Sequence, residues 1–147
     1  MRTLLIAGDH AGFDTKEFIK QSLEEQQYTI IDFGAFSDER MDYPDVVHPL
    51  AREINAGVYS TGIILCGSGN GVNMTANKYP NVRSALCWTK EIASLARKHN
   101  NANVIAIPAR FVDKQTAWDI VITFLSTDFE EGRHCQRVNK ITTGIQL

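Results

Sequence analysis

The sequence predicts an α/β fold of three layers, in which a five-stranded parallel sheet carries helices on both faces. The first observation behind this prediction is that short apolar runs of strand length alternate with helix-length segments along the chain. The second is that no repeat, low-complexity tract or interdomain linker interrupts the 147 residues, which is the length of one domain. We therefore expect residues 1–147 to form a single domain.

Five apolar runs have the length and composition of buried strands. They cover residues 4–8, 28–33, 62–66, 82–87 and 104–107. Helical segments are expected at about 15–26, 46–54, 72–78, 89–99, 114–126 and 133–141. At the start of the first helix, Asp14 is expected to act as the cap and Glu17 to complete a capping box. Phe13 is expected to pack against Phe18 there.

The composition is that of an ordinary globular protein. Hydrophobic residues make up 44% and charged residues 22% of the chain, and the formal net charge is −2, with both signs interleaved. This balance offers no basic surface for nucleic acid or for an anionic membrane. The apolar runs are too short for a signal peptide or a membrane span. We therefore expect a cytoplasmic protein without a nucleic-acid or membrane partner.

The spacing of cysteines and histidines argues against disulfides and a structural metal. The three cysteines are odd in number and form no C-x-x-C pair, which favours reduced thiols: Cys66, Cys87 and Cys135. The four histidines lack the i,i+3 or i,i+4 spacing of a helical metal site: His10, His48, His99 and His134. We therefore expect no metal.

The most informative segment is the glycine-rich stretch from Cys66 to Gly71, which directly follows the third strand. Alternating glycines there expose successive backbone N–H groups that can bind a phosphate or a developing oxyanion, and the nearby helix N-terminus favours a thiolate. The spacing is neither the dinucleotide-binding G-x-G-x-x-G nor a phosphate-binding loop ending in G-K-[ST]. On spacing alone, a glycine turn beside an inert buried cysteine explains the segment equally well.

Other polar residues also follow the ends of strands or helices. Asp9 and His10 come directly after the first strand, where they can bind a sugar or phosphate, although Asp9 can equally cap the next turn. His99 ends a helix, where the helix dipole stabilises its charged form for acid catalysis or for a simple capping role. Arg133 and Arg137 lie one helical turn apart and suit a phosphate, but a solvated face paired with nearby glutamates is the simpler interpretation.

Six segments give a more specific signal when they are taken together. They are residues 8–12 (Gly-Asp-His-Ala-Gly), 42–45 (Asp-Tyr-Pro-Asp), 66–71 (Cys-Gly-Ser-Gly-Asn-Gly), 76–78 (Ala-Asn-Lys), 97–103 (Arg-Lys-His-Asn-Asn-Ala-Asn) and 131–138 (Glu-Gly-Arg-His-Cys-Gln-Arg-Val). In this order over nearly the whole chain, they closely resemble ribose-5-phosphate isomerase B and related sugar-phosphate isomerases. The resemblance implies a Rossmann-like fold and a cofactor-free interconversion of ribose 5-phosphate and ribulose 5-phosphate.

The resemblance also implies roles for individual residues. Cys66 would move the proton between C2 and C1 of the substrate, and the Ser68 hydroxyl with the loop amides would hold the enediolate oxygens. His99 would assist opening of the sugar ring, with Asp9 close to the ring oxygens. The implied substrate-binding residues are His10, Tyr43, Gly67, Gly69, Asn70, Gly71, Asn100, Arg110, Arg133 and Arg137. Relatives without the cysteine use a glutamate directly after the last glycine, and here that position is Val72, which places the chain in the cysteine branch.

The family resemblance further implies a homodimer, which can pair into a homotetramer, with the helix at 133–141 at the dimer interface. Three alternatives stay open at this point. The substrate can be a hexose 6-phosphate, such as allose or galactose 6-phosphate. The chain can be a cysteine hydrolase built on Cys66, His99 and Asp9, or a non-catalytic sensor of a phosphosugar.

Overall fold

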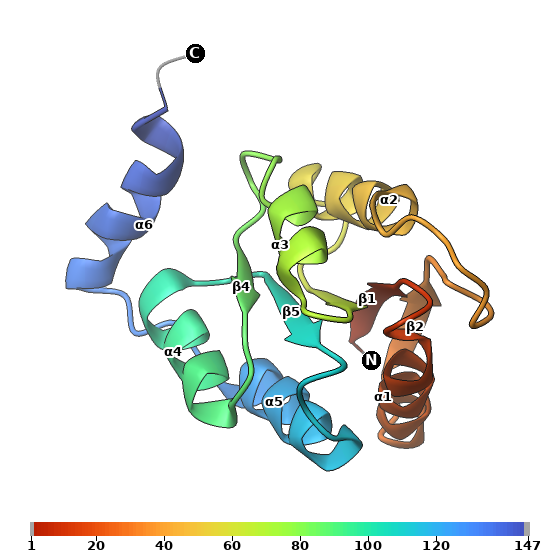
Figure 1. Ribbon diagram of the computed structural model, residues 1–147. Helices are drawn as coiled ribbons and strands as arrows, with labels where there is room; N and C mark the ends of the chain where they lie inside the picture. The colour runs from red at the N-terminus through yellow and green to blue at the C-terminus, as the bar shows by residue number, and fades with distance from the viewer. Residues whose placement is uncertain (1, 146–147) are drawn as a thin grey trace.

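The computed structural model describes residues 2–145 as a five-stranded sheet with six helices (Figure 1). The strands are β1 (Thr3–Gly8), β2 (Thr29–Asp32), β3 (Gly62–Cys66), β4 (Ser84–Leu86) and β5 (Val104–Pro108). The helices are α1 (Phe13–Glu25), α2 (Pro44–Asn55), α3 (Asn70–Ala76), α4 (Lys90–Asn100), α5 (Lys114–Ser126) and α6 (Arg133–Thr143). None of these helices has the length and apolar character that a membrane span requires.

The strand order places the ends of β1 and β3 where ligands of such sheets bind. All neighbouring strands are parallel, and their order is β2-β1-β3-β5-β4. From β1 the chain goes to β2 on one side, whereas β3, β4 and β5 all lie on the other side of β1. The strand order therefore reverses between β1 and β3. Ligands of open parallel sheets bind beside the carboxyl ends of the strands at such a reversal. Gly8 and Cys66, the last residues of β1 and β3, lie at that point.

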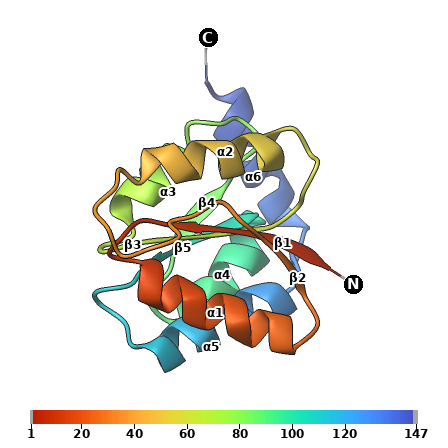
Figure 2. The same ribbon diagram turned by 90° about the vertical axis from the view of Figure 1, so that its right-hand side faces the viewer.

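The sheet divides the interior into two cores, as Figure 2 shows by the helices on its two sides. Leu4 and Ile6 of β1 pack with α1, α4 and α5 on one face, while Leu5 and Ala7 pack with α2 and α3 on the other. Successive side chains of a strand point to opposite faces, so a strand buried on both sides is apolar at every position. This confirms the predicted three-layer α/β fold with helices on both faces.

Most element bounds agree with the prediction, and the differences have local causes. The predicted 62–66 strand and 114–126 helix coincide with β3 and α5. The edge strands β2 and β4 are shorter than predicted, because each pairs with a single neighbour over four and three residues. The last helix continues to Thr143, beyond the predicted end at residue 141.

The predicted capping box at the first helix is wrong. The helix α1 begins at Phe13, its N-cap is Gly12, and no side chain caps it. Gly12 lies so close to β3 that a β-carbon there would be 2.8 Å from the Leu65 Cβ, so glycine is what allows this approach. Asp14 therefore lies inside the first turn, and Glu17 pairs with the Nζ of Lys16 at 2.8 Å.

The last helix lies apart from the sheet and extends away from the body of the molecule (Figure 1). It packs against α4, to which His134 and Val138 present its buried side. Ile141 and Ile145, at its far end, are about half exposed. This places a peripheral helix beside the end of α4 that carries His99 and Asn100.

Candidate active site

A cavity of about 580 Å³ opens where β1, β3 and β5 end. Its lining combines the turn after β1, the segment before α2, the loop after β3 and the loop after β5. The predicted site residues among them are Asp9, His10, Tyr43, Cys66, Gly67, Ser68, Gly71 and Arg110. Gly69 and Asn70 continue the same loop. One chain therefore brings together ten of the fourteen predicted positions.

The Cys66 side chain lies at the base of this cavity. It is the last residue of β3, only 5% exposed, and its sulfur accepts a hydrogen bond of 3.2 Å from the Gly69 backbone N–H. The Ser68 hydroxyl oxygen accepts a bond of 3.3 Å from the Asn70 backbone N–H, which leaves the hydroxyl proton available to a ligand. The loop therefore presents a thiol and a hydroxyl donor side by side.

Glycine at two loop positions makes room for two other site residues. A β-carbon on Gly71 would overlap the ring of Tyr43, and one on Gly67 would lie 3.2 Å from the Arg110 Cδ. Gly69 has a left-handed backbone with φ of +76°, which a residue with a side chain rarely adopts. The glycines thus form the turn and also let an aromatic ring and a guanidinium group reach the cavity beside Cys66.

The turn after β1 fixes Asp9 and His10. The Oδ1 of Asp9 accepts hydrogen bonds from the backbone N–H groups of Ala11 and Gly12 at 3.0 and 3.1 Å, so Asp9 does cap this turn while it also lines the cavity. The Nδ1 of His10 accepts a bond of 3.3 Å from the Met41 N–H. When the ring is neutral, this bond places its proton on Nε2, which is then a donor.

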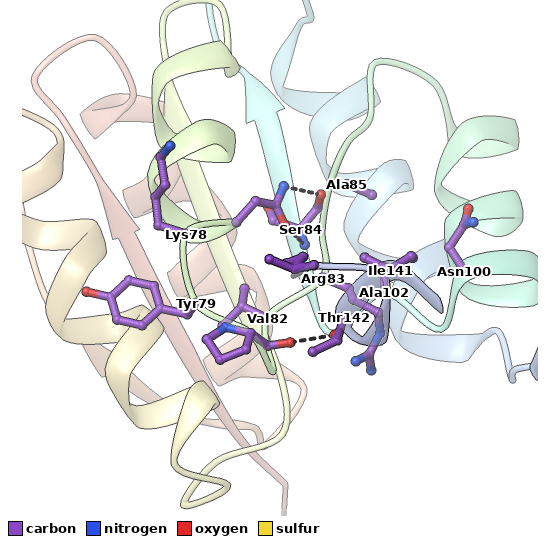
Figure 3. A pocket seen from close by; sticks show the side chains of 13 residues that line it. Lys78, Tyr79, Val82, Arg83, Ser84, Ala85, Asn100, Ala102, Ile141 and Thr142 are labelled. Atoms are coloured by element: carbon purple, nitrogen blue, oxygen red, sulfur yellow. Dashed lines mark hydrogen bonds between the residues drawn. The ribbon is translucent and has the colours of Figure 1, made fainter. Parts of the chain in front are cut away.

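The structure places the other four predicted residues elsewhere. His99 stacks on the buried His134 of α6, with ring centroids 4.4 Å apart. Asn100 lines a second cavity of about 470 Å³ between the β4 region and α6 (Figure 3). Arg133 and Arg137 belong to α6, and across residues 2–145 neither has a carboxylate oxygen within 4.0 Å, so the predicted pairing with Glu130 or Glu131 is absent.

Sequence reasoning missed His134, Asp42 and Phe111. Asp42 and Phe111 line the Cys66 cavity, and Asp42 lies within one of the family-like segments. His134 precedes the buried Val138 by four residues, a spacing that marks one helix face and could have indicated its burial.

Of the other two cysteines, Cys135 is half-buried, and burial raises the pKa of the Cys87 thiol to about 12, which keeps that thiol protonated.

Sequence relatives agree on one enzyme family. A family model described as Ribose/Galactose Isomerase matches residues 4–141. The chain is 42% identical to a probable ribose-5-phosphate isomerase B of Mycoplasma pneumoniae, over 94% of this chain and 91% of the relative. It is 38% identical to ribose-5-phosphate isomerase B of Escherichia coli K12, over 97% and 95% of the two chains.

Solved structures show the same similarity. A ribose 5-phosphate isomerase of Thermotoga maritima superposes with a TM-score of 0.94 at 42% identity, covering 97% of this chain and 98% of that one. Ribose-5-phosphate isomerase B of Mycoplasma genitalium, solved with bound ribulose-5-phosphate, superposes with a TM-score of 0.92 at 38% identity over 97% and 95% of the chains. Because the family model covers nearly the whole chain and the fold matches throughout, this chain belongs to the ribose/galactose isomerase family.

Proposed function

We propose that this chain is a cytoplasmic aldose–ketose isomerase that interconverts ribose 5-phosphate and ribulose 5-phosphate through an enediolate. The observation that carries the proposal is the placement of the Cys66 sulfur in the cavity at the end of β3, within a glycine loop that offers backbone N–H donors. Family membership and the names of the relatives support the reaction class and the pentose phosphate.

The proposed reaction moves protons and needs no external oxidant or reductant. The Cys66 thiolate takes the proton from C2 of the open-chain aldose, and the electron pair of that C–H bond becomes the C1–C2 double bond of the enediolate. In this step the electrons of the C1 carbonyl bond move onto the C1 oxygen. The thiol then returns a proton to C1, while the C2 hydroxyl proton passes to the C1 oxygen, so that C2 becomes the ketone and C1 carries the hydroxyl. A positioned base of this kind contributes about 10²–10⁴-fold to rate.

The surrounding groups suit the charge that develops on the substrate. The Ser68 hydroxyl and the amides of the glycine loop are donors for the enediolate oxygens, and each well-placed donor contributes about 3 kcal/mol to the transition state. Arg110 and His10 add positive or proton-donating groups at the rim. Because these donors are held by backbone bonds before substrate arrives, little reorganisation is needed during the reaction.

We infer that a second copy of the chain completes the site. His99, Asn100, Arg133 and Arg137 lie on α4 and α6, outside the Cys66 cavity of their own chain. In a homodimer with α6 at the interface, the second copy would supply ring opening through His99 and phosphate binding through the two arginines. Ile141 on α6 and Ile145 just after it are half-exposed and fit such an interface. Two dimers can pair further into a tetramer.

The test is turnover of ribose 5-phosphate to ribulose 5-phosphate, with allose 6-phosphate and galactose 6-phosphate assayed in parallel. We expect the pentose phosphate to react with the highest kcat/KM. A preference for a hexose phosphate would keep the chemistry and change the substrate, and no turnover of any of the three would refute the proposal. A cysteine hydrolase is the weaker alternative, because the sulfur's hydrogen-bond partner is the Gly69 amide and not an imidazole.

A further inference from the structure

His99, Glu130 and His134 form a cluster of three metal-ligating side chains outside the Cys66 cavity. The Oε2 of Glu130 lies 3.7 Å from the Nε2 of His134 and 4.0 Å from the Nε2 of His99. The three donor atoms all lie within 4.8 Å of one another. The two imidazole rings stack with an interplanar angle of 13°, and both Nε2 atoms lie near the same carboxylate oxygen. The cluster joins the end of α4 to the start of α6.

The donor spacing is close to what a small divalent ion needs. Ligand bonds of about 2.0–2.2 Å in a tetrahedral site place the donors about 3.3–3.5 Å apart. The two distances to the Glu130 Oε2 exceed this by a few tenths of an ångström. The nearly parallel rings must also turn before both Nε2 lone pairs point at one ion, and the side chains of His99 and Glu130, at 40% and 51% exposed, leave room for that movement. The His134 side chain, at 8% exposed, is the fixed ligand around which they would gather.

The type of donor selects the class of metal. Two imidazoles and one carboxylate, with room for water, are the ligand set of open zinc sites, whereas Mg²⁺ and Ca²⁺ prefer oxygen ligands. Nearby Arg133 and Arg137 repel a cation, which argues for reversible binding and against a permanently held ion.

We propose that His99, Glu130 and His134 bind a transition-metal dication such as Zn²⁺ and that the bound ion inhibits the isomerase. The ion occupies the Nε2 lone pair of His99, the residue to which ring opening is assigned, and it ties α6 to α4. The inhibition rests on the proposed function, whereas binding of the metal does not.

The binding test uses Co²⁺, whose visible absorption reports the ligands, and calorimetry with Zn²⁺. We expect one ion per chain in the wild type and at least tenfold weaker binding in His134→Gln and in Glu130→Gln. Glu130 is exposed, so its variant keeps the test valid if the buried His134 variant does not fold. His48→Gln is the matched control, because His48 bonds to Tyr79 outside the cluster and should leave metal binding unchanged.

Two results of the binding test would overturn the proposal. One is an unchanged affinity for the metal in whichever of His134→Gln and Glu130→Gln folds. The other is a thiolate-to-cobalt charge-transfer band, which would show that a cysteine such as Cys66 is the ligand. Both results are independent of any sugar-phosphate turnover, so they are distinct from a failure of the proposed function.

The activity test measures ribose 5-phosphate turnover while Zn²⁺ is titrated and then removed with a chelator. We expect half-inhibition at the concentration that half-saturates binding, full recovery with chelator, and at least a tenfold higher half-inhibiting concentration for Glu130→Gln. Saturated binding with undiminished turnover would overturn the inhibitory role. If no sugar phosphate is turned over at all, the proposed function fails, and the cobalt titration alone decides the metal site.

Discussion

The aromatic ring of Tyr43 lies directly against the backbone of Gly71. A β-carbon built on Gly71 would overlap the ring at its Cζ, Oη and Cε1 atoms. Tyr43 precedes α2, whereas Gly71 lies in the first turn of α3, so this contact joins the segment before α2 to the loop that holds Cys66. The missing side chain at Gly71 is therefore what allows Tyr43 to line the cavity.

A methyl group at Gly71 should displace Tyr43 and weaken catalysis. We expect Gly71→Ala to lower kcat/KM for ribose 5-phosphate by about tenfold or more, because misplacing a substrate-positioning group by about 1 Å has costs of this order. In a Tyr43→Ala background the new methyl group has space, and the added loss should nearly vanish. An equal loss in both backgrounds would show that the effect does not pass through the ring.

Replacing the Cys66 thiol should remove turnover and spare binding. We expect Cys66→Ala to lower kcat by about 10²–10⁴-fold with a small change in KM, as loss of a general base does. Cys87→Ala is the control, because Cys87 is buried in the opposite core and stays protonated. Steady-state turnover of both variants tests the assignment of Cys66 as the base, and a near-normal kcat in Cys66→Ala would refute it.

A site shared between two chains makes a specific prediction for mixed subunits. Cys66→Ala and His99→Asn should each be inactive as homodimers. In a heterodimer, one of the two symmetry-related sites takes Cys66 from one chain and His99 from the other, so it is wholly wild type. Random mixing makes about half of the dimers heterodimers, each with one good site, which predicts recovery of about a quarter of wild-type activity.

The measurement is turnover after the two variants are unfolded and refolded together, beside each variant refolded alone. The same total amount of wild-type chain, refolded in the same way, gives the activity that counts as full. If the mixture stays as inactive as its components, each site is built within one chain and the homodimer proposal is wrong in this respect.

The buried imidazole of His134 predicts how stability depends on pH. Its pKa lies below the ordinary 6.5, because burial and then the charges of His99, Arg133 and Arg137 disfavour the proton more than Glu130 favours it. In the unfolded chain the imidazole regains its ordinary pKa, so below about pH 6.5 the unfolded state binds more protons and folding stability falls as pH falls.

The comparison is the Tm of the wild type and of His134→Gln at about pH 7.5 and about pH 5.5. The variant cannot take up this proton, so its Tm should fall less on acidification than that of the wild type. Parallel losses in the two proteins would assign the acid sensitivity to other groups, such as the carboxylates.

The buried ion pair between Lys16 and Asp32 should be the most sensitive polar contact of the fold. Lys16 is fully buried and its Nζ lies 2.6 Å from the Oδ2 of Asp32, which also accepts a bond from Lys20 at 3.2 Å. Asp32→Asn leaves the buried ammonium with the half-exposed Glu17 as its remaining partner. We expect a loss of about 3 kcal/mol in the free energy of unfolding.

Urea denaturation measures this loss, and Lys20→Gln provides the control. Lys20 is more exposed than Lys16 and shares the same carboxylate, so its removal should cost at most about 1 kcal/mol. Equal effects of the two variants would show that burial of Lys16 adds nothing to the strength of the pair.

The sequence predicts most of the fold because its signals are local. A strand such as β5 is apolar at every position, which indicates burial on both faces. The alternating glycines after Cys66 mark the turn at the end of β3. The loops that follow parallel strands share one edge, which predicts that Asp9, His10 and Cys66 meet in one place. The cavity brings these residues together.

What the sequence could not predict depends on contacts between distant segments. Helix α1 starts after Gly12, which lies against Leu65 of β3, and the local capping signal of Asp14 does not report that contact. The stacking of His99 on His134 depends on how α6 lies against α4, and no residue spacing reports that arrangement. For the same reason, spacing alone leaves open which chain carries each half of the proposed site.

The position of α6 has a consequence for how this enzyme scaffold can change. Cys66 belongs to the core that the sheet forms with α2 and α3, where a substitution disturbs packed neighbours. Arg133 and Arg137 instead lie on the peripheral helix α6, which packs against α4. If the two arginines bind the phosphate as proposed, substitutions along α6 can move that end of the substrate without touching Cys66. Such a division lets a scaffold accommodate sugars of different length while its chemistry stays the same.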